Sequence, residues 1–385
     1  APARVRDAAA RLKRWLLEAA LPIWWARAAD REGGGYFDRL NLDGTVAANP
    51  KRLRVQARQA YVYALAPGLG WSGPAKQASR HGLIQMMSHK CDDGLFRTRP
   101  DEPAPRDGMG LLYDQAFVML ALASDLVAFG DHDQQRHALA VLRDIAAFAH
   151  PRGGYAEAPG LPEPLFGNPN MHLFESAQAW MRAKDGGAWD QLAAGLARFA
   201  CERLIDPASG AMLERFGPDW QAPAAAAERF VWPGHLYEWA FLLLDRPRVT
   251  AGERAAALRL IEVSEERGVD RARGIVIFAL DDQLAPLDRG ARLWAQTERL
   301  RACTRAAAIA GDGSQTTGIQ ASAMWDAVAE AIGALDAFLD VPTRGLWRDW
   351  MGPDGAFVDE PAPASSLYHI AGAIAELVRQ TSAPP

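Results

Sequence analysis

Three histidines stand where helices are expected to begin, and two of them are followed three residues later by a glutamate. These pairs are His172 with Glu175 and His235 with Glu238, and the third histidine is His369. Side chains three residues apart share one face of a helix, so each pair should lie together. The helix dipole disfavours a positive charge at a helix start. The sequence therefore predicts neutral imidazoles, which can act as general bases near neutral pH.

The segment around His235 indicates a buried setting. Residues 231–244 read Val-Trp-Pro-Gly-His-Leu-Tyr-Glu-Trp-Ala-Phe-Leu-Leu-Leu, so a Pro-Gly break precedes a helix that is apolar on almost every face. Buried polar groups cost free energy unless they are paired. A core histidine bonded to its own Glu238 is the alternative to a catalytic role. The remaining histidines lie in polar or outer-helix contexts and are interpreted as solvated surface residues: His81, His89, His132, His137 and His150.

Further candidates lie in other predicted helices of the apolar type. Arg58 interrupts one of them, and a buried arginine needs an anionic or multiply hydroxylated partner, with an ion pair to a glutamate as the alternative. Tyr113 and Asp114 open another, where Asp114 could simply favour the helix start. Three tryptophans near predicted loops offer faces that could stack on a sugar ring: Trp232, Trp294 and Trp350.

These candidates belong to an internal repeat. Glycines near positions 34, 94, 154, 210, 274 and 345 recur roughly every sixty residues, each opening a short strand or hairpin. Two helices separate successive glycines, and they are expected over residues 4–29, 53–66, 74–89, 112–129, 133–149, 170–183, 187–204, 234–245, 251–267, 290–309, 319–340 and 365–379. Mostly apolar helices alternate with amphipathic ones. Since an open array needs polar caps, this pattern predicts a closed all-α (α/α)6 barrel with short β-hairpins at its rim, forming one catalytic domain over residues 1–385.

Composition narrows the function further. The 385 residues are 49% hydrophobic and 23% charged, with a formal net charge of −5 and scattered Lys and Arg, which does not indicate nucleic-acid binding. We expect no membrane span and no signal segment. Cys91, Cys201 and Cys303 lie far apart without metal-ligand spacing, as is typical of reduced thiols in a cytoplasmic protein.

An ordered set of motifs resembles the N-acylglucosamine 2-epimerase superfamily, which includes cellobiose 2-epimerases and mannose isomerases. In chain order the motifs are Gln-Ala-Arg-Gln at 56–59, Tyr-Asp-Gln-Ala-Phe at 113–117, Asn-Pro-Asn-Met-His-x-x-Glu at 168–175, Pro-Gly-His-x-x-Glu-Trp at 233–239, Trp-Ala-Gln-Thr-Glu at 294–298 and Tyr-His at 368–369. The resemblance covers nearly the whole chain. The run Ser-Ser-Leu-Tyr-His-Ile at 365–370 is more similar to mannose isomerases than to cellobiose epimerases.

The resemblance implies an (α/α)6 barrel that isomerises or epimerises a mono- or disaccharide without a cofactor or a metal. It implies that His235 and His369 are catalytic and that the sugar contacts are Arg58, Asn168, His172, Glu238 and Trp294. Tyr113, Asp114 and Glu175 complete the predicted substrate-binding set by their places in inner helices. Residues 222–227 carry no basic side chain, so no phosphate or sulfonate site is assigned there. We expect a monomer or homodimer without nucleic-acid or membrane partners.

The expected chemistry is proton transfer beside a carbonyl. After ring opening, a neutral histidine would remove the C2 proton, and Arg58 and His172 would stabilise the cis-enediolate. Return of the proton to C1 gives a ketose, as from D-mannose to D-fructose, whereas delivery to the other face of C2 gives an epimer. Alternatives are a glycoside hydrolase using Asp114 and Glu238, a metal-dependent isomerase using both His-x-x-Glu pairs, and a non-catalytic binding barrel.

Overall fold

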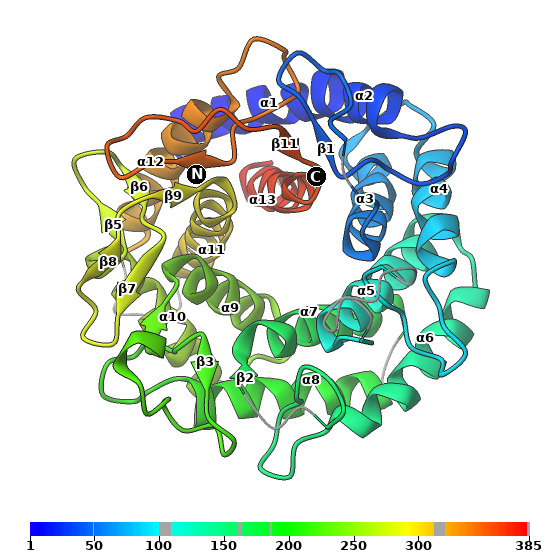
Figure 1. Cartoon of the computed structure of the whole chain (residues 1–385). Coiled ribbons are helices and arrows are strands. Elements are labelled where there is room, and N and C mark those ends of the chain that lie inside the picture. Colours follow the sequence, from blue (N-terminus) through cyan, green and yellow to red (C-terminus); the bar gives the residue numbers. More distant parts are fainter. Residues whose placement is uncertain (49, 100–108, 161–163, 185–186, 312–319, 383–385) are drawn as a thin grey trace.

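The computed structural model describes residues 1–48, 50–99, 109–160, 164–184, 187–311 and 320–382, and these form two concentric rings of helices (Figure 1). The inner ring consists of α3 (Leu53–Leu65), α5 (Leu112–Phe129), α7 (Gly167–Ala183), α9 (Pro233–Asp245), α11 (Leu293–Gly311) and α13 (Ser366–Thr381). The outer ring consists of α1 (Ala3–Trp15), α4 (Ala75–Met87), α6 (Asp133–Asp144), α8 (Ala188–Phe199), α10 (Ala251–Arg267) and α12 (Ala321–Leu339). The predicted (α/α)6 barrel is confirmed.

The rings exist because the two helix types bury different amounts of surface. Every residue of α9 from Pro233 to Leu244 is buried, whereas α6 buries only two of its residues, Ala138 and Val141. A helix that is apolar all round needs protein on every side, which only an inner position supplies. The first and last parts of the chain close the ring: α1 packs on α13 and α12 (Figure 1), and Arg11 of α1 binds Asp336 of α12 at 2.6 Å.

The loops that follow the outer helices carry short antiparallel strands at one rim. The pairs are β1 (Arg39–Leu40) with β11 (Ala362–Pro363), β2 (Leu165–Phe166) with β3 (Arg215–Phe216), β5 (Val269–Asp270) with β6 (Ile275–Val276), and β9 (Ala291–Arg292) with β10 (Trp350–Met351). A three-stranded sheet joins β4 (Phe230–Val231), β7 (Ala279–Asp281) and β8 (Pro286–Asp288). Several glycines between bridged residues have positive φ, such as Gly94 at 86°, and this backbone conformation explains the glycine repeat.

A recurrent amide contact fixes the rim to the inner ring. Gln56, the fourth residue of α3, accepts a hydrogen bond from the Tyr36 amide at 2.7 Å and donates one to the Tyr36 carbonyl at 2.8 Å. The same two-way contact joins Gln115 to Phe96, Asn170 to Tyr155 and Gln296 to Val276. These amides therefore satisfy buried backbone groups that the loops would otherwise leave unpaired. In α13 the fourth residue is His369 instead.

Three details differ from the sequence-based expectation, and a fourth expectation falls outside the described residues. The helix at 4–29 contains π-helical turns at Leu16–Ala20 and Trp24–Ala28 around α2 (Leu21–Ile23), where Pro22 lacks an amide hydrogen. The α7 helix begins at Gly167 rather than 170, because Pro169 is tolerated in a first turn. The turn at Gly345 forms a parallel bridge, from Arg344 to Leu346, rather than a hairpin. Residue 319, the expected start of the penultimate helix, lies outside the described residues.

One described helix, α5, is long and apolar enough to cross a membrane when judged by length and composition alone. Its eighteen residues have a mean hydropathy of 1.4. However, 72% of this window is buried inside the protein, where α5 packs between α3 and α7. The apolar character therefore belongs to an inner barrel helix.

Candidate active site

The predicted site residues gather near the start of the six inner helices, because inner helices all run away from the looped rim. Most of them lie within the first two turns of α3, α5, α7, α9, α11 or α13. Each inner helix follows a rim loop, so all six inner helices begin at the same end of the barrel. Residues separated by more than three hundred positions thus share one cluster.

His235 is bound by a carboxylate that the sequence did not indicate. Its Nδ1 lies 2.7 Å from Oε2 of Glu214, which comes from the loop before β3. Both side chains are buried, at 6% exposure each. The expected partner, Glu238, does not make this contact. A carboxylate can only accept a hydrogen bond, so Nδ1 of His235 is the donor in this pair and Nε2 is the ring nitrogen left for a substrate.

His369 has an equivalent arrangement. Its Nδ1 lies 2.7 Å from Oε1 of Glu298, and burial holds the pKa of His369 well below its usual value. The partly buried Trp294 ring lies close to both histidines, with centroid distances of 4.9 Å to His235 and 5.9 Å to His369. Two histidines thus lie near one indole, and each is oriented through Nδ1 by a glutamate.

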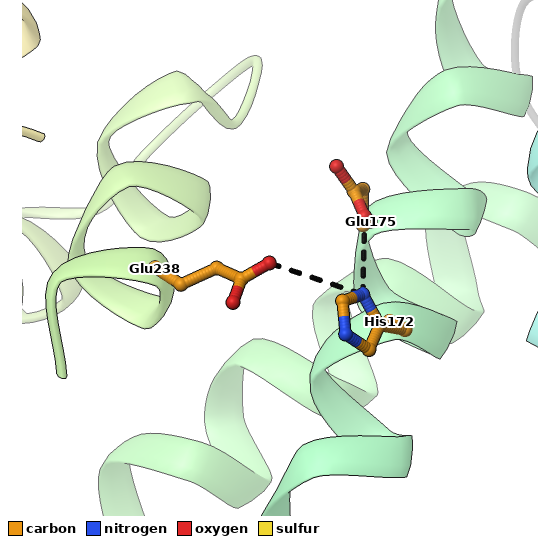
Figure 2. A group of neighbouring side chains, drawn as sticks. All are labelled: His172, Glu175 and Glu238. Atoms are coloured by element: carbon orange, nitrogen blue, oxygen red, sulfur yellow. Dashed lines mark hydrogen bonds and ion pairs between the residues drawn. The ribbon is translucent and has the colours of Figure 1, made fainter. Parts of the chain in front are cut away.

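The third histidine keeps the predicted contact with its own glutamate (Figure 2). Nδ1 of His172 lies 3.3 Å from Oε2 of Glu175, and 4.0 Å from Oε1 of Glu238 on the facing helix. Burial lowers the pKa of His172 to about 4, so its imidazole is neutral near neutral pH. The Tyr368 hydroxyl also donates a hydrogen bond to Glu175. Burial alone would raise the pKa of Glu175, but His172 and the Arg301 charge lower it to about 2.

Arg301 supplies positive charge beneath this cluster. Its guanidinium lies 3.4 Å from Glu175 and 3.5 Å from Glu298, and it stacks 3.9 Å from the centroid of Phe241. The donor atoms of His172, Glu175 and Glu238, and likewise those of Glu238, Glu298 and His369, lie within 4.8 Å of one another. Such spacing could surround a cation, but Arg301 already provides the counter-charge to two of the three carboxylates.

Arg58 supplies a second positive charge to the site, and it lies beside Tyr113. Arg58 is buried, donates to the Tyr113 hydroxyl at 2.7 Å and to the Ser365 carbonyl at 3.3 Å, and lies 4.3 Å from the centroid of Phe117. Among the described residues Arg58 makes these contacts and no ion pair with a glutamate. The alternative of a structural Arg58–glutamate ion pair is therefore not supported. The Tyr113 ring also meets His172 edge-on at 5.1 Å.

Asp114 and Asn168 occupy different surroundings. The fully buried carboxylate of Asp114 lies 3.4 Å from Arg54 and accepts a hydrogen bond from the Thr98 hydroxyl, which ties α5 to the rim. Asn168 instead lines a cavity of about 320 Å³ at the mouth, and its buried Oδ1 has no hydrogen-bond partner within the described ranges. This cavity also contacts Tyr113, Glu214 and Trp232, and its volume is at the lower end for a small-molecule site.

Four residues complete the cluster although sequence reasoning did not assign them to the site: Glu214, Glu298, Arg301 and Tyr368. Glu298 and Arg301 are charged residues of a buried helix and share a face, so periodicity could have indicated them. Tyr368 directly precedes His369, a predicted catalytic residue, and this position could have indicated it. Glu214 lies in a loop with no comparable signal, and only the fold brings it to His235.

Fold and site together define a barrel whose mouth holds oriented histidines, aromatic rings and hydrogen-bonding groups. A model of the N-acylglucosamine 2-epimerase family matches residues 35–373. The chain is 39% identical to a mannose-6-phosphate isomerase of Rhizobium meliloti (strain 1021), over 96% of both sequences. It is also similar in structure to a D-mannose isomerase, with a TM-score of 0.83, 21% identity and coverage of 95% and 97% of this chain and that one. For a cellobiose 2-epimerase from Bacillus thermoamylovorans B4167 the TM-score is 0.82, with 16% identity and coverage of 96% and 99%.

The chain therefore belongs to the N-acylglucosamine 2-epimerase family. It is an enzyme of the carbohydrate isomerase or epimerase class, as predicted from the ordered motifs.

Proposed function

We propose that the protein interconverts D-mannose and D-fructose, or their 6-phosphates, through a cis-enediolate, with His235 and His369 as the proton-transferring residues. The observation that carries this proposal is the placement of two histidines beside the Trp294 indole, each with Nδ1 held by a carboxylate 2.7 Å away. The similarity to a mannose-6-phosphate isomerase and a D-mannose isomerase supports this substrate class.

The chemistry follows from the free Nε2 atoms. One histidine takes the C2 proton of the open-chain aldose and the electron pair moves into a C1–C2 double bond, while the carbonyl oxygen gains negative charge. Arg58 is the candidate donor to that charge, and Trp294 is the face on which the sugar would stack. His172 was predicted as a second donor, but its neutral ring gives the Nδ1 hydrogen to Glu175 and leaves only a lone pair on Nε2. Delivery of the proton to C1 gives the ketose, and delivery by the second histidine to the opposite face of C2 gives the epimer. Epimerisation is accordingly the second candidate reaction.

The phosphorylation state of the substrate is a separate question. Arg54 and Arg215 both line the mouth cavity, whereas residues 222–227 offer no positive charge. Glu157 and Glu214 line the same cavity, so its charge is balanced rather than strongly basic. We propose that the unphosphorylated sugar is accepted, and comparison of kcat/KM for mannose and mannose 6-phosphate tests this directly.

Proton NMR of the protein with D-mannose in D2O tests the reaction. Appearance of fructose, with deuterium entering carbon-bound positions, is the expected result. Glucose as first product would establish epimerisation instead. If neither product forms from mannose or its 6-phosphate, the proposed substrate class is wrong, and N-acetylhexosamines and cellobiose become the next sugars to test.

The rival reactions make different demands on the same residues. A glycosidase using Asp114 and Glu238 would need both carboxylates to face a glycosidic bond, but Asp114 is engaged by Arg54 and Thr98. A metal-dependent isomerase would need a cation among carboxylates that Arg301 already pairs. We propose a single-domain, cytoplasmic enzyme that acts without cofactor or metal as a monomer or homodimer.

A further inference from the structure

Glu238 is a carboxylate without a partner at the centre of the barrel. It lies in the second turn of α9 with an exposed fraction of 1%. Neither of its side-chain oxygens makes a hydrogen bond to any residue that the structure describes. Nδ1 of His172 lies 4.0 Å from Oε1 of Glu238, but that nitrogen is closer to Glu175, at 3.3 Å (Figure 2). Such a group is costly as an anion, because burial removes water without supplying a replacement.

The groups around Glu238 come from every inner helix that faces it. They are Arg58 of α3, His172 and Glu175 of α7, Glu298 and Arg301 of α11, Tyr368 and His369 of α13, and His235 of its own helix. Only two guanidinium groups face three glutamates in this set. Both His172 and His369 have lowered pKa values and are neutral near neutral pH. One proton among the three glutamates therefore brings the buried cluster to zero net charge.

The contacts decide which glutamate carries that proton. Glu175 is bound by His172, Tyr368 and Arg301, which all favour its ionised form. Glu298 is bound by His369 and lies beside Arg301. Glu238 alone has no donor. Burial raises the pKa of Glu298 to about 7, and burial with the charges of Glu298 and Glu175 raises the pKa of Glu238 well above its usual value. The absence of any donor to Glu238 among the described residues therefore decides between these two glutamates.

We propose that Glu238 is a neutral carboxylic acid in the working enzyme and donates a hydrogen bond to an oxygen of the enediolate. This role rests on the proposed isomerase function. The carboxyl lies within 4.8 Å of a ring nitrogen of His369, so it can reach an oxygen on the carbons between which the proton moves. An ionised glutamate there would repel the developing negative charge, whereas a neutral acid stabilises it without giving up its proton.

Infrared difference spectroscopy of the sugar-free protein tests the protonation state without relying on activity. A neutral carboxylic acid has a carbonyl stretch at higher wavenumber than a carboxylate. We expect such a band at neutral pH in the wild type but not in Glu238→Gln. It should persist in Glu298→Gln, although it should be lost at a lower pH there, because burial is the largest cause of the raised pKa of Glu238 and the charge of Glu298 is the second. A wild type without the band, or a band that disappears in Glu298→Gln and persists in Glu238→Gln, would overturn the proposal. Glu238→Ala assigns the band if the glutamine variant folds poorly.

Kinetics on the sugar that the wild type converts test the donor role. Removal of one donor to a developing oxyanion costs about 10²- to 10³-fold in kcat, which is the loss expected for Glu238→Leu. Glu238→Gln keeps a donor N–H, so its loss should be at least about tenfold smaller. The alkaline fall in kcat that we expect in the wild type, from loss of the Glu238 proton, should be absent in this variant. Equal losses in both variants would overturn the donor role. If the wild type converts no sugar, the infrared result still decides whether Glu238 is neutral.

Discussion

The substitution Glu214→Gln tests whether His235 depends on a residue that only the tertiary structure brings to it. The two side chains meet at 2.7 Å and both are buried, so water cannot replace the carboxylate. Glutamine keeps an oxygen that accepts the Nδ1 hydrogen, and the tautomer and ring orientation are retained. What is lost is the negative charge that stabilises His235 while it holds the transferred proton.

The magnitude follows from that charge. A hydrogen bond to a charged group contributes about 1.5–3 kcal/mol and a neutral one about 0.5–1.5 kcal/mol, so loss of the charge alone costs about 1–1.5 kcal/mol, and about 1.4 kcal/mol corresponds to a tenfold change in rate. We therefore expect kcat/KM for the converted sugar to fall by about 5- to 13-fold, with most of the loss in kcat. The exposed Glu202 offers a matched control, because Glu202→Gln removes the same charge at the rim and should leave the rate within about twofold of the wild type.

A double-mutant cycle separates this role from general damage to the fold. In a His235→Ala background, Glu214→Gln should cost at most about twofold more, because its only catalytic partner is already gone. Additive losses in the cycle, or a single variant that keeps wild-type kcat/KM, would refute the reasoning. Thermal melts of each variant ensure that folded proteins are being compared.

Four other outcomes are expected. His235→Ala and His369→Ala should each lower kcat at least about 10²-fold while circular dichroism stays native, and near-full activity in either would exclude it as a proton-transfer residue. Gln296→Ala should lower the free energy of unfolding by about 1–3 kcal/mol, measured in urea, because it leaves the buried amide and carbonyl of Val276 unpaired. The pKa of His172 is about 4 in the folded protein and 6.5 when the ring is free, so between these pH values the unfolded state binds a proton there more readily than the folded state. The free energy of unfolding should therefore fall by about 3 kcal/mol as the pH is lowered through this window, and it should change less in His172→Gln. Extended dialysis against a chelator should leave the rate of sugar conversion unchanged, and a loss restored by one divalent metal would contradict the assignment of a metal-free site.

The amino-acid sequence by itself determined the barrel and the main polar residues of its mouth. Helical periodicity separates inner from outer helices because burial on every side requires apolar residues on every face, as in α9. The glycine repeat arises because turns at the rim need positive φ angles. The histidines lie near helix starts because all inner helices begin at the same end of the ring. These are local properties of the chain.

The tertiary structure decided which side chains of different elements are partners, whereas helical spacing had already paired His172 with Glu175. Spacing left open a bond between Glu238 and His235, but Glu238 lies 4.0 Å from His172, and His235 binds Glu214 from a rim loop. Spacing also left Asp114 open as a sugar contact, whereas its buried carboxylate ties α5 to Arg54. Hydrogen bonds between distant elements depend on how helices are rotated and packed, and a one-dimensional pattern specifies which face is buried but not what the neighbouring helix presents to it.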